Sequence, residues 1–270
     1  LSVIVMINHF KNKALTIAGS DSGAGAGIQA DLKTFSSLGV YGTTVLTAIT
    51  AQNTIGVQEV EMLPVKIVES QIKSVLSDIG TDSVKTGMLG NAEIIHTTAR
   101  TLEYFTYKNL VVDPVMVAES GDLLLEDSAI EAYINYLFPM AILVTPNIYE
   151  AEKISGVKIT NEKSLIESGN KILDMGSKKV LIKGGHSKGE FSEDVLFTSS
   201  GITKLREKRV VTNNTHGTGC TLSAAITAFL AKGDNVEFAV RKGKEYITKA
   251  LQASYDISKG TGPVNHFFRT

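Results

Sequence analysis

The feature that most constrains the fold of this chain is a regular alternation of short apolar runs with longer segments of helical periodicity. Such runs are typical of buried strands, and helical segments between them are long enough to cross back over a sheet. The alternation is therefore typical of βα units and parallel strands. With 270 residues, 43% of them hydrophobic, the chain can bury a large core. We predict a single α/β domain over residues 1–270, with a mainly parallel central sheet.

The pattern places each expected element. The expected strands are Ala14–Ala18, Thr43–Thr50, Ser83–Thr86, Leu110–Val112, Ile142–Val144 and Val180–Lys183, with two further strands at Phe191–Thr198 and Ile202–Val211. The expected helices are Ala26–Leu38, Pro64–Leu76, Ala92–Phe105, Ser128–Leu137, Ile148–Ser155, Glu162–Met175, Gly219–Ala231 and Val236–Lys259. Residues 1–12 are expected as an N-terminal extension, in which Leu1–Val5 precede a natural start at Met6.

Charge and composition exclude several classes of partner. Lys and Arg total 27 against 28 for Asp and Glu, so the chain lacks the basic field of a nucleic-acid-binding protein. Its one Cys excludes a disulfide framework and suits a reducing compartment. No apolar stretch approaches the length of a membrane span, and Leu1–Ile7 lacks the flanks of a signal peptide. We predict a cytoplasmic protein with no nucleic-acid or membrane partner.

The 24 glycines are clustered, and the first cluster, GSDSGAGAG at residues 19–27, directly follows the first expected strand. Three small residues in this region fit the G-x-G-x-x-A spacing of a dinucleotide-binding turn. That fingerprint expects an acid about twenty positions on, whereas the next acid after Asp31 is Glu59. A turn without a ligand stays open. The favoured interpretation is that these glycines let a small substrate approach the backbone, beside Asp21 and Asp31.

The second cluster, THGTGCT at residues 215–221, immediately precedes the apolar run Leu222–Leu230. Glycines at a helix start leave backbone N–H groups free to face an anion, and the helix dipole favours negative charge there. Cys220 falls in the first turn, where a thiol pKa tends to fall. Three roles for Cys220 stay open: a buried core residue, a covalent nucleophile with His216, or a general base for a substrate hydroxyl.

Eight segments in chain order resemble the hydroxymethylpyrimidine kinase/phosphomethylpyrimidine kinase family of thiamine biosynthesis, within the ribokinase-like superfamily. The segments are ALTIAGSDSGAGAGIQADLKTF, TAITAQNT, VKTGMLG, VVDPVM, VTPNIYEAE, IKGGH, NTHGTGCTLSAAI and GPVNHF. The resemblance implies a three-layer ribokinase-like fold with helices on both faces of the sheet. It also implies ATP- and Mg²⁺-dependent phosphorylation of 4-amino-5-hydroxymethyl-2-methylpyrimidine, then of its monophosphate to the diphosphate. Because the family is often dimeric, we expect a homodimer.

The resemblance also assigns the phosphate end of the site. Cys220 is implied as the base that activates the hydroxymethyl group, and the backbone of Gly217, Thr218, Gly219 and Cys220 as an anion hole. Alignment and charge stabilisation would supply much of the catalysis. We expect His216 to belong to the turn rather than to act as a catalytic acid.

For the substrate end, the resemblance implies Gln52 as the residue that recognises the pyrimidine, because its amide offers both a donor and an acceptor. Gly19, Asp31 and Met88 map to the same pocket, with Met88 as an apolar wall for the ring. For Asp31, a place on an exposed helix face is an equal alternative.

For the nucleotide end, Asp113 and Glu150 are expected as oxygen ligands of Mg²⁺, often through water. Lys183, Asn147 and Thr212 are expected at the nucleotide, where the ammonium of Lys183 would meet its phosphates.

One position departs from the family pattern. Glu119 stands where family members commonly carry a basic residue in a loop, so we expect a weaker second phosphorylation. The nearest rival activity is that of a pyridoxal kinase, although the segment AQNT favours the pyrimidine. A binding module without catalysis is a second alternative, and retention of Cys220, Asp113, Asn147 and Glu150 argues against it.

Overall fold

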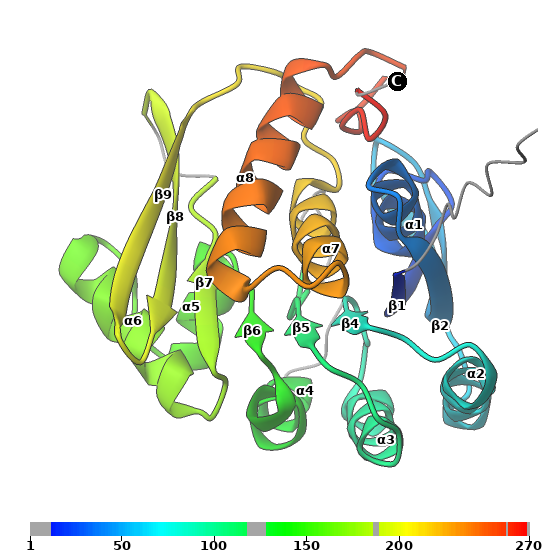
Figure 1. Ribbon diagram of the computed structural model, residues 1–270. Coiled ribbons are helices and arrows are strands. Elements are labelled where there is room, and N and C mark those ends of the chain that lie inside the picture. The colour runs from blue at the N-terminus through cyan, green and yellow to red at the C-terminus, as the bar shows by residue number, and fades with distance from the viewer. Residues whose placement is uncertain (1–11, 118–127, 186–188, 258, 269–270) are drawn as a thin grey trace, which may run out of the picture.

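The structure is a computed structural model and describes residues 12–117, 128–185, 189–257 and 259–268. Within these residues nine strands form one sheet in the order β3-β2-β1-β4-β5-β6-β7-β8-β9 (Figure 1). The strands are β1 (Lys13–Asp21), β2 (Tyr41–Gln52), β3 (Val57–Met62), β4 (Ser83–Thr86), β5 (Leu110–Val112), β6 (Leu143–Val144), β7 (Lys179–Ile182), β8 (Phe191–Thr198) and β9 (Gly201–Lys208). From β2 to β7 every neighbouring pair is parallel, which confirms the mainly parallel sheet.

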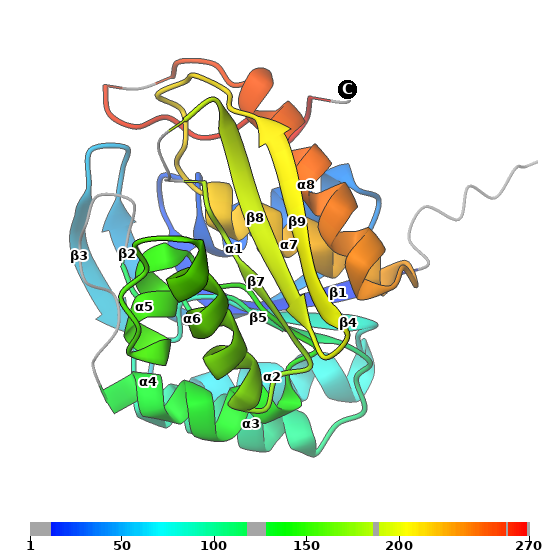
Figure 2. The same cartoon turned by 90° about the vertical axis from the view of Figure 1, so that its left-hand side faces the viewer.

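Helices cover both faces of this sheet, as Figures 1 and 2 show. One face carries α1 (Gly27–Ser37), α7 (Thr218–Ala231) and α8 (Val236–Gln252). The other carries α2 (Val65–Asp78), α3 (Ala92–Glu103), α4 (Ser128–Ala132), α5 (Ile148–Ser155) and α6 (Glu162–Asp174). A π-helical turn, Tyr133–Leu137, and a 3₁₀ turn, Phe138–Met140, follow α4. The predicted three-layer arrangement is thereby confirmed.

The central strands β4, β5 and β6 are buried along their whole length because both faces of the sheet are covered. In β5, alternate side chains enter two separate cores: Leu110 and Val112 pack under α2–α6, and Val111 packs under α7 and α8. Helix α7 lies between α1, α8 and the sheet, so residues 221–231 are buried on every side. Among the described residues, no helix is both long enough and apolar enough to cross a membrane.

Several elements differ from the sequence prediction. The strand predicted over Ile202–Val211 is β9 and ends at Lys208. The helix predicted over Ser128–Leu137 is α-helical only to Ala132, where the π-helical turn begins. β3 (Val57–Met62) was not predicted, because it is an exposed edge strand with three polar residues and pairs antiparallel with β2. Figure 2 shows this β2–β3 hairpin projecting beyond the helical layers. The last helix ends at Gln252 rather than at Lys259. Leu1–Val5 and the rest of residues 1–11 lie outside the described residues.

The order of the strands reverses at β1. The chain passes from β1 to β2 on one side, whereas β4 and the following strands extend from the other side. In open parallel sheets a crevice forms at the carboxyl ends of the strands where the order reverses, and ligands bind there. The carboxyl end of β1 leads directly into the first glycine cluster.

An ion pair lies in the core beneath that crevice. Lys85 Nζ lies 2.7 Å from Asp31 Oδ1 and 2.8 Å from Oδ2, and Thr16 Oγ1 donates to Oδ2 at 2.6 Å. Both charged side chains are fully buried. Burial raises the pKa of Asp31, although Lys85 and Thr16 act in the opposite direction. Asp31 is therefore a core partner of Lys85 and not an exposed residue of a helix face.

We expect Lys85→Met to destabilise the fold by about 3–5 kcal/mol, because it leaves the buried Asp31 carboxylate unpaired. Urea unfolding at neutral pH measures this change. The double variant Asp31→Asn/Lys85→Met removes both charges and is the control, expected to recover most of the loss. A single variant within about 1 kcal/mol of the unsubstituted protein would contradict this role.

Candidate active site

A cavity of about 310 Å³ opens at the carboxyl ends of β1, β4, β5 and β7. Among the described residues, most of those predicted from the sequence lie on its wall: Gly19, Gln52, Met88, Asp113, Asn147, Glu150, Lys183, Thr218, Gly219 and Cys220. These residues come from both glycine clusters and from the ends of several strands. The arrangement therefore brings the predicted substrate, nucleotide and phosphate groups around one space.

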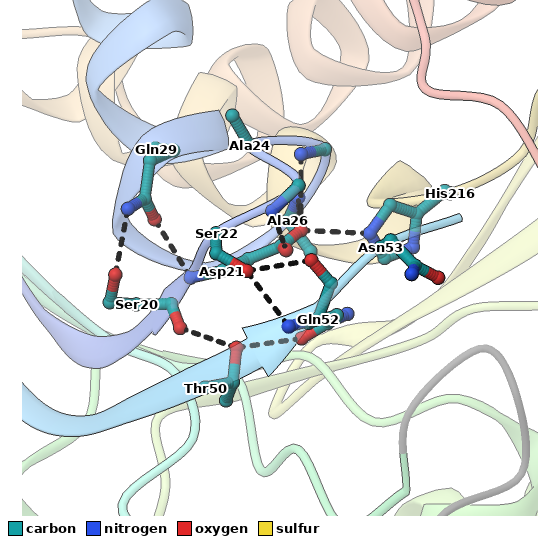
Figure 3. A network of polar contacts seen from close by, with 12 residues as sticks. Ser20, Asp21, Ser22, Ala24, Ala26, Gln29, Thr50, Gln52, Asn53 and His216 are labelled. Atoms are coloured by element: carbon teal, nitrogen blue, oxygen red, sulfur yellow. Dashed lines mark hydrogen bonds and ion pairs between the residues drawn. The ribbon is translucent and has the colours of Figure 1, made fainter. Parts of the chain in front are cut away.

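At one end lies the first glycine turn, residues 19–27, next to the end of β2 (Figure 3). The hydroxyl of Ser22 donates to the carbonyl of Gln52 at 2.6 Å and accepts from its backbone N–H at 2.8 Å. This double contact attaches Gln52 to the turn. The Gln52 side chain lies on the cavity wall, as a ring-recognising amide must.

The hydrogen bonds of Thr50 define which way the Gln52 amide faces. Thr50 Oγ1 lies 2.8 Å from the carbonyl of Ser20 and 3.1 Å from Gln52 Oε1. A hydroxyl carries one hydrogen, so it cannot donate to both oxygens. Turning the amide by half a rotation lets Gln52 Nε2 donate to Thr50 while Thr50 donates to Ser20. The amide oxygen is then left to accept a hydrogen bond from a ligand.

Two glycines of the first turn have a structural role that the sequence did not predict. A Cβ at Gly27, where φ is +56°, would lie 2.4 Å from the carbonyl oxygen of Gly19. A Cβ at Gly25 would lie 2.2 Å from the His216 ring. These two glycines are needed so that the chain can approach itself. At Gly19, which lines the cavity, a Cβ would instead lie 2.9 Å from Met88 Sδ.

At the other end lies the second glycine turn, residues 215–220, which begins α7. Gly217 caps the helix with φ of +76°, a left-handed conformation that favours glycine. Among the described residues, the structure records no acceptor for the N–H of Gly219 or of Cys220, as is typical of a first helical turn. Lys183 Nζ lies 3.4 Å from the position of a Cβ at Gly219. A cation and free N–H groups thus face the same part of the cavity, as in a phosphate site.

Asp113 and Glu150 both lie near this ammonium. Lys183 Nζ is 2.7 Å from Asp113 Oδ1 and 3.9 Å from Glu150 Oε2. Ser223 Oγ donates to Asp113 Oδ2 at 2.8 Å, and Thr145 Oγ1 to Oδ1 at 3.2 Å. Burial and the charge of Asp113 raise the pKa of Glu150, while Lys183 opposes them. Both carboxylates therefore face a place already built for positive charge.

The N-x-x-E spacing of Asn147 and Glu150 also has a structural role. Asn147 Oδ1 accepts the N–H of Glu150 at 2.9 Å, and Glu150 Oε2 accepts the N–H of Asn147 at 2.7 Å. This reciprocal capping box begins α5 and fixes the Glu150 carboxylate at the edge of the cavity.

Cys220 is half-buried on the cavity wall. Burial raises the pKa of its thiol to about 11, although the positive charge of Lys85 opposes the shift. A helix start was expected to lower this pKa, whereas burial of the thiol away from water raises it. The thiol is therefore protonated at neutral pH.

Three predicted residues do not line the cavity. Asp31 is paired with Lys85, whose Nζ lies 3.5 Å from the position of a Cβ at Gly87, so the pair lies beneath the cavity floor. The prediction that Asp31 contacts the substrate is therefore corrected: Asp31 lies one layer of residues below the cavity surface. Thr212 Oγ1 lies 3.1 Å from Ser254 Oγ instead of in the cavity. Gly217 lies behind the wall, against the carbonyl of Gly25. Glu119 lies outside the described residues.

A buried polar group on the wall formed by β8 and α8 was not predicted from the sequence. Lys244 Nζ lies 2.8 Å from Asp194 Oδ2 and 2.9 Å from Ser192 Oγ, and all three residues line the cavity. The available signal was a lysine on the apolar stripe of α8, between Val240 and Ile247.

The fold and this cavity together define a small-molecule kinase of the ribokinase-like class. A sequence profile of the phosphomethylpyrimidine kinase family matches residues 21–265, so the chain belongs to that family. This finding confirms the predicted resemblance and the kinase function in thiamine biosynthesis.

Individual relatives agree. The chain is 50% identical to a hydroxymethylpyrimidine/phosphomethylpyrimidine kinase of Rhizobium meliloti, over 95% of this chain and 97% of that one. It is 46% identical to a thiamine biosynthesis bifunctional protein of Geobacter sulfurreducens, over 95% of this chain, and spans about half of that relative's length (52%).

Two solved structures are also similar. A phosphomethylpyrimidine kinase from Clostridium difficile is 48% identical with a TM-score of 0.79, covering 89% of this chain and 100% of that one. A pyridoxal kinase from Staphylococcus aureus in complex with AMP-PCP and pyridoxal is 38% identical with a TM-score of 0.89, covering 96% and 94%.

The Cys220 thiol gives a direct test of the site's electrostatics, because it is the only cysteine of the chain. We expect its alkylation by iodoacetamide in short pulses to accelerate about tenfold per pH unit above neutrality. The rate should level off near pH 11. The control is the urea-unfolded chain, whose rate should level off near pH 8.5, about the value of a free thiol. If the rate for the folded protein levels off at a lower pH than the rate for the unfolded chain, the raised pKa of Cys220 is contradicted.

Proposed function

We propose that this protein uses ATP to phosphorylate 4-amino-5-hydroxymethyl-2-methylpyrimidine, and then its monophosphate to the diphosphate. The observation that carries the proposal is the shared cavity: Gln52 lies on one part of its wall, and Cys220 at the start of α7 lies on another. An acceptor amide oxygen suits the exocyclic amine of the pyrimidine. The hydroxymethyl group would then face the second glycine turn.

The nucleotide phosphates are proposed to lie between the second glycine turn and Lys183. Free N–H groups and an ammonium stabilise negative charge that develops during phosphoryl transfer. The pyridoxal kinase of Staphylococcus aureus binds AMP-PCP in a fold that matches this one, which supports ATP as the donor. The wall that includes Lys244 and Asp194 is a further part of the same cavity.

Asp113 and Glu150 fit a Mg²⁺ ion, because carboxylate oxygens are the ligands that this ion prefers. Among the described residues no group of three His, Cys, Asp or Glu side chains forms a closed metal site. Two carboxylates, with water and phosphate oxygens as further ligands, are the usual set for Mg²⁺ bound with a nucleotide. The ion would supply charge neutralisation, while these two residues orient it.

Cys220 is proposed to contact the hydroxymethyl group. Because its thiol is protonated at neutral pH, alignment of the hydroxyl against the anion-binding turn is its first contribution. Removal of the proton would need further positive charge near the sulfur, and Lys85 already acts in that direction.

Pyridoxal phosphorylation is a second candidate, favoured by the TM-score of 0.89 with the pyridoxal kinase of Staphylococcus aureus. Pyridoxal also carries a hydroxymethyl group on a six-membered nitrogen heterocycle. Gln52 distinguishes the two substrates, because an amide at this position complements an aminopyrimidine edge.

A coupled ADP-release assay tests both candidates. We expect turnover with the pyrimidine alcohol and with its monophosphate. The kcat/KM for pyridoxal should be lower by about tenfold or more, because pyridoxal lacks the amine from which Gln52 would accept a hydrogen bond. An assay without substrate is the control for ATP hydrolysis. Absence of turnover with all three substrates would refute the kinase proposal.

Two variants separate catalysis from binding. Cys220→Ala should lower kcat by about a hundredfold or more while leaving pyrimidine affinity within a few-fold, as loss of a transition-state contact does. Gln52→Ala should mainly raise KM. Isothermal titration with the pyrimidine and steady-state kinetics give the two quantities. Turnover of Cys220→Ala near that of the unsubstituted protein would return Cys220 to a packing role.

Four further properties stay predictions. They are the homodimer, the cytoplasmic location, the single domain and a weaker second phosphorylation because of Glu119. Exposed apolar side chains on the β2–β3 hairpin, Ile49 and Val60, offer a surface that a second copy could cover.

A further inference from the structure

The two glycine turns are joined by one buried side-chain contact. His216 Nε2 lies 2.8 Å from Asp21 Oδ2, although the residues are 195 positions apart in the sequence (Figure 3). Their side chains are only 9% and 3% exposed, and both residues line the cavity. The contact therefore crosses from the end of β1 to the residue that precedes Gly217.

The partners of Asp21 define the direction of this hydrogen bond. Its Oδ1 accepts the N–H of Gly23, and its Oδ2 accepts those of Gly25 and Ala26. Burial acts against ionisation, but the contacts with His216 and these N–H groups outweigh it and hold the pKa of Asp21 below its usual value. An ionised carboxylate only accepts, so His216 Nε2 is the donor.

The backbones of the two turns also touch. A Cβ at Gly25 would lie 2.2 Å from His216 Cδ2, and a Cβ at Gly217 would lie 1.8 Å from the carbonyl oxygen of Gly25. No residue larger than glycine fits at either position without a shift of the chain. The His216 ring is thus held against one turn while its own backbone belongs to the other.

This contact continues into the groups proposed to bind the reactants. Ser22, next to Asp21, holds both backbone groups of Gln52. On the other side, Gly217 follows His216 and caps α7, where Cys220 lies in the first turn. The backbone N–H of His216 also donates to the carbonyl of Gly262 at 3.0 Å, which anchors the turn from behind.

We propose that Asp21 and His216 form a positioning pair that sets the separation between the ring-binding turn and the phosphate-binding turn. Neither residue needs to exchange a proton with the substrate for this role. The hydrogen bond keeps the hydroxyl of a ring held at Gln52 within reach of a phosphoryl group held at α7. A displacement of about 1 Å between reacting atoms can lower a rate by about a hundredfold, so a single contact of this kind affects kcat. This inference rests on the proposed kinase function.

The test compares His216→Leu with His216→Gln. Leucine removes the donor but leaves Asp21 with its three backbone N–H partners, so no carboxylate is left unpaired. Glutamine places a donor nitrogen the same number of bonds from the backbone as His216 Nε2. We expect His216→Leu to lower kcat by about tenfold to a hundredfold with KM values within about threefold, and His216→Gln to recover most of kcat.

Ser168→Ala is the matched control. It removes a buried hydrogen bond of 2.8 Å to Ser155, between α6 and α5 and outside the cavity. It should lower the melting temperature as His216→Leu does while leaving kcat unchanged. If kcat falls equally in both, the effect of His216 is on stability alone and the proposal is wrong. An unchanged kcat in His216→Leu, or no recovery in His216→Gln, would also overturn it.

A readout without turnover separates this proposal from the proposed function. A saturating pyrimidine alcohol should protect Cys220 from iodoacetamide by about tenfold in the unsubstituted protein and in His216→Gln, but by only about threefold in His216→Leu. If the unsubstituted protein shows protection without turnover, the kinase proposal fails while the positioning pair stands or falls on this comparison. Equal protection in all three proteins, or none in any, would overturn the positioning pair.

Discussion

The position of the polar groups around the cavity depends on one constraint: helices cover the parallel sheet on both faces. Strands such as β5 supply apolar side chains to two cores, and a charged side chain within the sheet needs a buried partner, as Lys85 of β4 has in Asp31. Polar residues that the chain needs for chemistry therefore gather where the strands end. Because the strand order reverses at β1, those ends surround a crevice rather than a covered edge.

The cavity is surrounded by buried cations, and each is held by carboxylates. Lys85 is paired with Asp31 beneath the floor, Lys183 with Asp113 on the wall, and Lys244 with Asp194 on the side of α8. A buried ammonium without such a partner would lose its proton or destabilise the fold. The pairs therefore keep positive charge close to the place where phosphate oxygens are proposed to bind.

The glycine clusters show how one residue type serves two needs. Gly219 lies beside the Lys183 ammonium on the cavity wall, at the helix start where its sequence context predicts anion binding. Gly25 and Gly217 instead allow two segments of the chain to touch, and this contact brings His216 onto Asp21. The close approach makes the substrate and phosphate ends of the cavity one unit.

The sequence by itself determined the order along the chain of the helices and of every strand except β3, the mainly parallel sheet, the family and ten residues of the cavity wall. Apolar periodicity and local motifs carry that information, because strand ends and helix starts depend on near neighbours in the chain. β3 escaped because an exposed edge strand has no buried run.

Only the tertiary structure decided the partners of Asp31 and Asp21 and the protonation state of Cys220. Asp31 meets Lys85 across 54 positions, and Asp21 meets His216 across 195. The protonation of Cys220 depends on how much water the packed chain excludes from the thiol, which is not a property of its neighbours in sequence. Such pairings and burial arise from the three-dimensional path of the chain, so no local pattern could have predicted them.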